Sequence, residues 1–348
     1  MTPRLKDIAR DLNLSVVTIS KVLRDHPDIS QGTRERVLKR MKELNYRPNL
    51  AARALVTGRS YIAGLVVPDL VHPFFGQVAR GLSSGLREKG YCLVLASSED
   101  DPELERQEID QLLARRVDVL IVASAQATVE TFHRLDEHKV PYVLIDRRFE
   151  GLEANFVGVD DAAMGELATA HLADAGCTRI AHIGGSDVST SLGRAEGFRR
   201  ALTARGLPVR PEYIEMRGHG DDAGDECGYA AMQRLLAVSP APDGVFCYND
   251  PTAMGAMKAV LEAGLRIPGD VAIAGCGNVA YAGFLRVPLT SVDQQSSVIG
   301  ERTARMALAL LENGAAAYPK TLLLEPELVV RASTMRERQK EAPGRRLP

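Results

Sequence analysis

From Tyr61 onward, short apolar runs alternate with amphipathic segments, and this alternation restricts the fold more strongly than any other feature of the chain. The apolar runs are continuous rather than spaced at every second residue, which is typical of parallel strands buried on both faces. Strands that alternate with helices predict an α/β fold with helices on both sides of a parallel sheet. The expected strands are 62–67, 91–97, 117–123, 141–145, 179–183, 244–247 and 271–274. The expected helices are 73–89, 103–115, 129–138, 162–175, 192–205, 224–237 and 251–263.

The strand and helix pattern begins again near residue 162, so the chain from Tyr61 contains two comparable halves. Two doubly wound parallel sheets of similar size predict a bilobed body with a ligand-binding cleft between the lobes. The total length of 348 residues agrees with two or three domains, because a domain usually has about 100–200 residues.

The composition, 45% apolar and 25% charged, is ordinary for a globular protein. No apolar stretch approaches the roughly 18–20 residues of a membrane span, and the N-terminal residues lack the apolar region of a secretory signal. The five cysteines lie far apart without a Cys-x-x-Cys motif, which argues against a disulfide framework or a zinc site. These features predict a cytoplasmic protein with no membrane association, no metal and no cofactor.

The net charge of −2 is an average over two unlike regions. Residues 1–60 contain 13 Lys plus Arg and 6 Asp plus Glu, a net charge of +7, so the other 288 residues carry −9. A basic module attached to an acidic body indicates nucleic acid as a partner of the basic part. A solvated basic face without a ligand is the alternative that charge alone leaves open.

The basic segment is expected to form short helices separated by turns. Helices are predicted at 5–12, at 16–23 and from residue 31 to about 45, with Ser15 and Ser30 as N-caps of the second and third. Two short helices joined by a three-residue turn form a small all-α helix-turn-helix domain. The second helix of such a domain can enter the major groove of DNA.

A long, ordered series of motifs runs through the first 55 residues. It consists of Asp7-Ile8-Ala9, Leu14-Ser15-Val16-Val17-Thr18-Ile19-Ser20-Lys21-Val22-Leu23, Ser30, Thr33-Arg34-Glu35-Arg36-Val37, Leu44-Asn45-Tyr46-Arg47-Pro48-Asn49, Ala52-Arg53 and Leu55. The series resembles the LacI/GalR family of bacterial transcription regulators, and the resemblance extends to about Thr334. It implies a DNA-binding repressor whose operator affinity is controlled by a small molecule.

The resemblance also implies which residues contact double-stranded DNA. Val16 and Val17 fall where the family's recognition helix meets base edges, and two valines can contact only apolar groups such as thymine methyls. Lys21 stands where the family usually has Arg, and lysine lacks the bidentate fork of arginine. The hydroxyl groups suit phosphate contacts, which position the protein without specifying sequence. The expected DNA-binding residues are Arg4, Ser15, Val16, Val17, Thr18, Ser20, Lys21, Ser30, Thr33, Asn49, Ala52 and Leu55.

The segment from Asn49 to Gly58 resembles the hinge helix of the family. A helix of this length does not persist alone in water. In the family it orders on DNA, pairs with the hinge helix of its dimer mate and inserts a leucine into the minor groove. Here Ala51 and Ala52 would allow close pairing and Leu55 would form the wedge. The alternative is that Leu55 packs on the body as a linker anchor.

The resemblance implies a domain organisation as well. Residues 1–48 form the helix-turn-helix domain, 49–60 the hinge and 61–334 a periplasmic-binding-protein-like effector domain, and 335–348 form a basic tail that is expected to be disordered. In this fold the chain crosses between the lobes three times, and the crossings are expected near Asp160, Pro288 and Leu322. The first lobe would comprise about 61–160 and 289–321, and the second lobe about 161–288 and 322–334.

Polar side chains follow most of the predicted strands, at the ends where parallel sheets bind ligands. Carboxylates, amides and a guanidinium beside aromatic rings suit a small polyhydroxy ligand such as a sugar or sugar derivative. The expected effector-binding residues are Phe74, Phe75, Ser124, Asp146, Arg147, Arg194, Asn249, Asn278 and Gln294. Turn capping is the alternative for Asp146 and Asn249, and an exposed salt bridge is the alternative for Arg194.

One stretch departs from the pattern of sugar-binding relatives. They commonly have an acidic pair after a Gly-aromatic step, whereas this chain has Gly275-Cys276-Gly277-Asn278. The usual carboxylate for sugar hydroxyls is absent there, so a neutral hexose bound in the usual manner is in doubt. Arg147, Arg194 and His72 could instead face an anionic ligand such as a sugar acid.

The sequence therefore predicts a homodimeric regulator, with a tetramer as the alternative, that binds a roughly palindromic operator. An enzyme is not expected, because the chain has no Gly-x-Gly-x-x-Gly, P-loop or Gly-x-Ser-x-Gly motif and no histidines at metal-ligand spacing. A solute-binding receptor without a DNA role and a regulator controlled by a protein corepressor are the competing functions.

Overall fold

The computed structural model describes residues 3–23, 26–46, 54, 58–126, 128–217, 224–313 and 319–336. The chain divides into two compact units, Met1–Ser60 and Tyr61–Pro348. Among the described residues, no helix combines the length and the apolar character that a membrane span requires.

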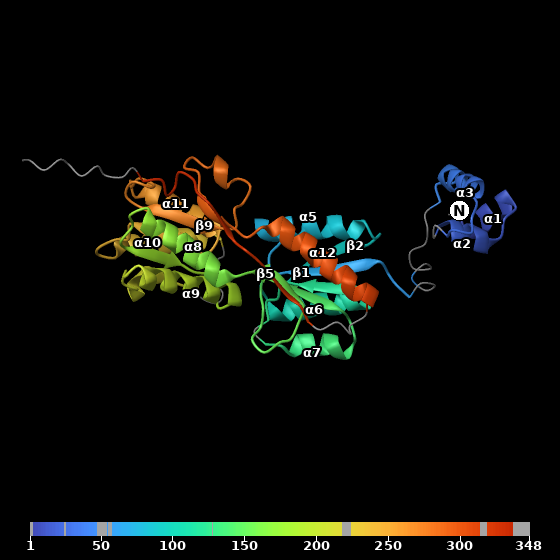
Figure 1. Ribbon diagram of the computed structural model, residues 1–348, viewed down its shortest axis with the longest axis horizontal. Helices are drawn as coiled ribbons and strands as arrows, with labels where there is room; N and C mark the ends of the chain where they lie inside the picture. Colours follow the sequence, from blue (N-terminus) through green and yellow to red (C-terminus); the bar gives the residue numbers. More distant parts are fainter. Residues whose placement is uncertain are drawn as a thin grey trace, which may run out of the picture. The chain divides into compact units, whose positions relative to one another are not determined.

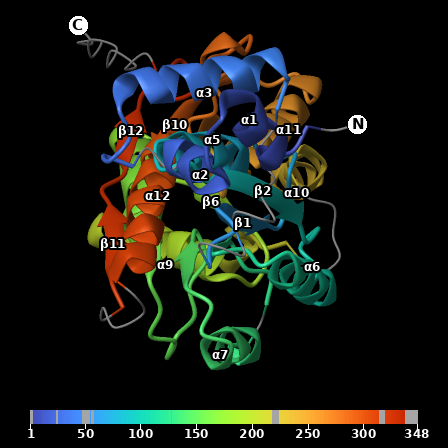
Figure 2. The ribbon, with the colours of Figure 1, turned by 90° about the vertical axis from the view of Figure 1, so that its right-hand side faces the viewer.

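The first unit contains three described helices, α1 (Leu5–Leu12), α2 (Val16–Leu23) and α3 (Gln31–Glu43), and α3 packs against both of the others (Figure 2). Helix α1 ends at Asn13, which has φ 53° in the left-handed region that asparagine tolerates. The Ser15 hydroxyl accepts from Thr18 N at 3.0 Å, and Ser30 caps α3 by accepting from Thr33 N. The core of this unit consists of Ile8, Ala9, Ile19, Val22, Val37 and Met41.

The described residues of the second unit form two six-stranded sheets. The first sheet has the order β11-β5-β4-β3-β1-β2 and is parallel throughout. Its strands are β1 (Ile62–Val67), β2 (Cys92–Ser97), β3 (Val119–Val122), β4 (Tyr142–Ile145), β5 (Phe156–Val159) and β11 (Thr321–Leu324). Helices α5 (Pro73–Arg87) and α12 (Ser296–Asn313) cover one face, and α6 (Pro102–Ala114) and α7 (Glu130–Glu137) cover the other (Figure 1). This sheet and its helices are called the first lobe.

The second sheet repeats the arrangement with the order β12-β10-β9-β8-β6-β7, and only β12 runs antiparallel. Its strands are β6 (Ile180–Ile183), β7 (Ile214–Glu215), β8 (Gly244–Cys247), β9 (Ala272–Cys276), β10 (Thr290–Asp293) and β12 (Glu327–Val329). The helix pairs α8 (Asp161–Asp174) with α9 (Ser189–Ala204), and α10 (Asp225–Ala237) with α11 (Asp250–Glu262), pack on it. Two short 3-10 helices lie at Pro211–Tyr213 and Ala282–Phe284. This sheet and its helices are called the second lobe.

The predicted fold class is confirmed, since an all-α helix-turn-helix unit precedes two doubly wound sheets. The crossings expected near Pro288 and Leu322 are wrong. Strand β10 pairs with β9 in the second sheet, and β11 pairs with β5 in the first. The chain therefore leaves the second lobe at 294–295 and the first lobe at 325–326. Each strand hydrogen-bonds with its sheet before the crossing, and the apolar pattern alone does not indicate which sheet a strand joins.

The end of the described chain also differs from expectation. Arg336 lies in the segment expected to be a disordered tail, yet its Nε donates to the Pro268 carbonyl at 3.0 Å. Ordered contacts with the second lobe therefore continue to Arg336. Residues 337–348 of the expected tail lie outside the described residues.

Candidate functional site

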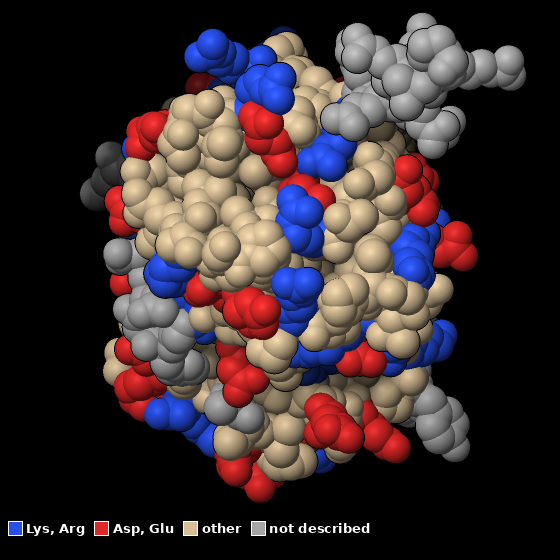
Figure 3. Space-filling model, turned by 90° about the vertical axis from the view of Figure 1, so that its left-hand side faces the viewer, with Lys and Arg blue, Asp and Glu red and all other residues tan. Residues whose placement is uncertain are grey.

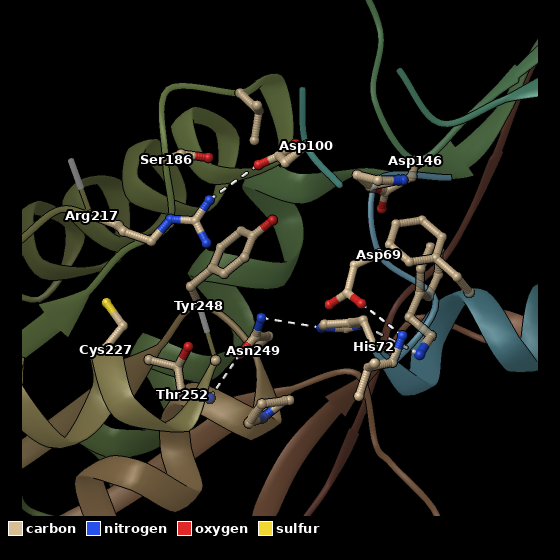
Figure 4. Close-up of a pocket in the computed structure, with 18 of the residues that line it drawn as sticks. Asp69, His72, Asp100, Asp146, Ser186, Arg217, Cys227, Tyr248, Asn249 and Thr252 are labelled. Carbon is tan, nitrogen blue, oxygen red and sulfur yellow. Dashed lines mark hydrogen bonds and ion pairs between the residues drawn. The ribbon is translucent and has the colours of Figure 1, made fainter. Parts of the chain in front are cut away.

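A cavity of about 1040 Å³ lies where the strand ends of the two lobes face each other (Figure 4). Most of its lining comes from segments that directly follow a strand, which is where open parallel sheets bind ligands. The polar and aromatic lining residues include Asp69, His72, Phe74, Phe75, Asp100, Asp146, Arg147, Arg194, Arg217, Tyr248, Asn249 and Gln294. Side chains from both lobes therefore converge on one space.

The wall on the first lobe begins at the N-terminus of α5. His72 is the N-cap of this helix, and its Nδ1 accepts from Phe74 N at 3.3 Å. Phe74 and Phe75 pack edge to face with their ring centroids 5.0 Å apart. Asp146 follows β4 with φ 62°, and its Oδ2 lies 4.0 Å from Nε of Arg147. This wall presents an aromatic surface beside carboxylates, an arrangement that suits the C–H faces and hydroxyls of a polyol.

The wall on the second lobe is built around the buried guanidinium of Arg194. Its Nε donates to Asp161 at 3.0 Å, Nη1 to the Tyr248 carbonyl at 2.8 Å and Nη2 to Gln294 at 3.3 Å. The guanidinium carbon lies 4.8 Å from the centroid of the Tyr248 ring. Arg194 is therefore engaged within the protein rather than in the exposed salt bridge that the sequence left open.

Within the described part of the chain, three polar contacts join the lobes around the cavity. Asn249 Nδ2 lies 3.2 Å from His72 Nε2, and Arg217 Nη2 lies 3.2 Å from Asp100 Oδ2. At the third contact, Arg148 N donates to the Ser189 hydroxyl at 3.1 Å. Figure 4 shows the first two as dashed lines on either side of the space. Any ligand in the cavity therefore lies between contacts that depend on the distance between the lobes.

The structure brings seven of the nine residues expected to bind the effector to the cavity wall: Phe74, Phe75, Asp146, Arg147, Arg194, Asn249 and Gln294. The other two, Ser124 and Asn278, do not line it. The buried Ser124 hydroxyl donates to Glu105 at 2.6 Å. Asn278 donates to Asp293 at 2.9 Å and accepts from Arg331 at 2.6 Å. The expectation for these two is wrong because both side chains are bonded inside their own lobes.

Sequence reasoning did not assign Asp100, Arg217 and Tyr248 to the site. Arg217 follows β7, a strand of only two residues that carries no detectable apolar pattern. Tyr248 directly follows β8, so the rule that placed Asn249 at the site could have found it. Burial lowers the pKa of His72, so the imidazole in this wall is neutral near pH 7.

The helix-turn-helix unit presents a mixed surface on α2. Val16 and Val17 are 45% and 63% exposed, which leaves both accessible for an apolar contact. Lys21 Nζ lies 3.2 Å from Asp28. Ser15 and Ser30 cap helices, while Thr18 and Thr33 pair with them through their hydroxyls at 2.8 and 2.9 Å. Arg4 is exposed at the start of α1 and Ser20 is half-buried on α2, whereas Asn49, Ala52 and Leu55 lie outside the described residues.

The charge on the second lobe is distributed differently from the positive excess in residues 1–60. Figure 3 shows the end of this lobe, where Lys and Arg alternate with Asp and Glu over a mainly uncharged surface. Within the described part of this face, neither sign forms a continuous patch. The excess of positive charge in residues 1–60 is the stronger electrostatic basis for binding nucleic acid. No group of three or more His, Cys, Asp or Glu that could hold a metal occurs among the described residues.

Two family models match the chain. The model of bacterial regulatory proteins of the lacI family matches residues 4–49, and the model of the periplasmic binding protein-like domain matches residues 169–334. The HTH-type transcriptional repressor PurR of Haemophilus influenzae (strain PittEE) is 31% identical over 336 residues, which cover 94% of this chain and 98% of that protein. The chain belongs to the LacI family of bacterial regulatory proteins.

Other members of the LacI family agree with this assignment over the whole length of the chain. The ribose operon repressor of H. influenzae (strain ATCC 51907 / DSM 11121 / KW20 / Rd) is 32% identical over 330 residues, covering 94% of this chain and 98% of that protein. A complex of the transcriptional regulator CelR with cellobiose has 30% identity and a TM-score of 0.72, covering 95% of this chain and 99% of that one. The chain is thus a DNA-binding transcription regulator of this family.

Proposed function

We propose that this protein is a repressor whose affinity for its operator changes when a small polyhydroxy ligand binds in the cavity between the lobes. The observation that carries the proposal is the cavity itself, because its walls come from both lobes and two side-chain contacts across it depend on their spacing. Related repressors and the complex of CelR with cellobiose support the combination of DNA binding and small-molecule binding in one chain. The protein binds its ligand without a catalytic step, acts in the bacterial cytoplasm and uses no cofactor.

DNA binding is proposed for the unit before Tyr61. A domain at 1–48 contacts the operator, and the hinge at 49–60 connects it to the effector domain at 61–334. Exposed Val16 and Val17 support apolar contacts with base edges. A homodimer places one such unit on each half of a roughly palindromic operator, and Leu55 forms the minor-groove wedge.

The charge of the cavity supports a neutral ligand rather than a sugar acid. The lining contains six carboxylates, from Asp69, Glu99, Asp100, Asp146, Asp187 and Asp225, and three guanidiniums, from Arg147, Arg194 and Arg217. Each guanidinium is already bonded to a carboxylate of the protein. An added anion would therefore meet a wall with three more carboxylates than guanidiniums, whereas hydroxyl groups can donate to carboxylate oxygens.

Control of DNA binding follows from which lobe carries the hinge. The first lobe begins at Tyr61, directly after the hinge segment, so a ligand that changes the arrangement of the lobes also changes the spacing of the two hinges in a dimer. A ligand shifts this equilibrium only through contacts that differ between the two arrangements. The contacts across the cavity are of that kind, and coupling of about 1–3 kcal/mol is typical.

A thermal-shift experiment on the full chain tests the ligand class. The probes are D-cellobiose, D-glucose and D-ribose, together with cellobionate, gluconate and ribonate at the same concentration. We expect at least one neutral sugar to raise the melting temperature and its acid to have no effect. A rise with the acids alone would contradict the neutral-ligand proposal. If none of the six compounds has an effect, the sugar class itself is wrong.

A further inference from the structure

The contact between His72 and Asn249 contains an unusual conflict of hydrogen-bond donors. His72 Nε2 and Asn249 Nδ2 lie 3.2 Å apart, with one residue on each lobe (Figure 4). Whether each of the two nitrogens donates or accepts at this contact depends on the other hydrogen bond that its side chain makes. Both side chains cap helices, His72 at the start of α5 and Asn249 at the start of α11.

The cap of α11 fixes the orientation of the asparagine. Asn249 Oδ1 accepts from Thr252 N at 2.9 Å, as an N-cap oxygen does. Exchanging the amide oxygen and nitrogen would point the NH₂ group at the backbone N–H of Thr252, which is also a donor. Asn249 therefore presents a donor, Nδ2–H, to the histidine.

The cap of α5 places a similar demand on His72. Its Nδ1 accepts from Phe74 N at 3.3 Å, so this nitrogen has to be the unprotonated one. A neutral imidazole has one donor and one acceptor nitrogen, and Nε2 then carries the proton. Burial disfavours the charged ring, in which both nitrogens would donate. With Nε2 protonated, the Nε2–H of His72 and the Nδ2–H of Asn249 are two donors that face each other. With Nδ1 protonated instead, the two donors that face each other are Nδ1–H of His72 and the backbone N–H of Phe74.

We propose that the ligand of this site places an acceptor oxygen between His72 and Asn249, so that one oxygen accepts from Nε2–H of the first lobe and Nδ2–H of the second. This inference rests on the proposed function and adds a specificity-determining residue, His72, and a chemical requirement on the ligand. A hydroxyl, ring or carbonyl oxygen satisfies the requirement, whereas an ammonium group or a C–H does not. The bridging oxygen removes the conflict only when both lobes reach it.

The variant Asn249→Asp tests the conflict in the ligand-free full chain. Aspartate has the shape of asparagine, so one oxygen still caps α11 while the other accepts from His72 Nε2–H. We expect a rise of the melting temperature by about 2–4 °C. The matched control is the same substitution in a His72→Asn background, which retains a capping oxygen for α5 and lacks Nε2. There we expect no rise, and an equal change in both backgrounds would overturn the inference.

Ligand binding provides a second test of the proposal. Calorimetry with D-cellobiose, D-glucose and D-ribose compares wild type with Asn249→Asp, in which an acceptor replaces the bridging donor. We expect about a tenfold or greater loss of affinity for any sugar that binds wild type, and unchanged affinity would overturn the bridging role. If no sugar binds wild type, the proposed ligand class fails while the melting experiment still decides the donor conflict.

Discussion

The guanidinium of Arg217 and the carboxylate of Asp100 join the two lobes at 3.2 Å on one side of the cavity. Asp100 also accepts from Arg147 of its own lobe at 2.6 Å, so one carboxylate lies between two guanidiniums. Both guanidiniums are largely shielded from water, with Arg147 11% and Arg217 19% exposed, while Asp100 is 34% exposed. Shielding strengthens such an arrangement and makes the loss of its central charge costly.

Replacing this carboxylate is therefore expected to loosen the lobes. Asp100→Asn leaves two guanidiniums without their shared charge, and we expect the free energy of unfolding to fall by about 1–2 kcal/mol. Urea denaturation of the ligand-free protein measures the change. The matched control is Asp174→Asn, which breaks an exposed pair with Arg205 within the second lobe and should cost less than about 1 kcal/mol. Equal losses of unfolding free energy in the two variants would show that the inter-lobe contact stabilises the protein no more than an exposed ion pair does.

A glycine at the close approach of α8 and α9 gives a packing prediction. A Cβ added to Gly197 would lie 1.9 Å from the Ala162 carbonyl oxygen, so the two helices would have to separate. We expect Gly197→Ala to lower the free energy of unfolding by about 1–3 kcal/mol. Gly76 on α5 has open space around its Cβ position, and Gly76→Ala should be neutral or stabilise the helix. A stable Gly197→Ala protein would contradict the observed packing.

Stability should also depend on pH through His182. This buried ring stacks between Phe198 and Phe246 at centroid distances of 5.3 and 4.9 Å, and burial lowers its pKa to about 4. A histidine pKa that is lower in the folded state means that the unfolded state binds the proton first as pH falls. Its contribution is complete above pH 6.5 and is lost toward pH 4, which amounts to about 3 kcal/mol.

The variant His182→Phe isolates this contribution because it retains an aromatic ring and removes the titration. Denaturation curves from pH 4 to 7 should show a shallower loss of stability for the variant than for wild type. Parallel pH profiles would mean that another group, rather than His182, causes the acid sensitivity.

For the DNA-binding unit, the prediction concerns the salt dependence of operator binding. Lys21 on α2 pairs with Asp28 in the free protein, and we expect its ammonium group to contact the operator in the complex. Lys21→Ala should weaken operator binding, and it should reduce the slope of log affinity against log salt by about 1 if the contact is with a phosphate. A contact with guanine would weaken binding and leave the slope nearly unchanged. Wild-type affinity together with a wild-type slope would exclude Lys21 from the interface.

The architecture could be predicted from the sequence because buried parallel strands have continuous apolar runs. Strand ends then located most of the cavity wall, since side chains such as Asp146 and Asn249 directly follow strands. Helix α12 and strands β5, β7, β11 and β12 were not predicted as elements. Sheet membership near residues 290–324 also depended on tertiary pairing, which local patterns do not contain.

The errors within the site have a common cause. Ser124 follows β3 as the rule requires, but the carboxyl group of Glu105 lies within hydrogen-bonding distance of it, and the serine is occupied. Arg217, which the rule missed, follows a strand too short to be detected. A sequence indicates which side chains reach a strand end, whereas the partners of those side chains come from elements far away along the chain.

The central claim is that occupancy of the cavity changes operator affinity. The direct measurement is fluorescence anisotropy of the full chain with an operator selected from random DNA, with and without a sugar whose binding calorimetry has established. The account predicts a change in operator affinity of at least about fivefold for wild type, and no change for Asp146→Asn at a sugar concentration that leaves its cavity empty. An operator affinity that stays the same while the sugar occupies the wild-type cavity would contradict the account.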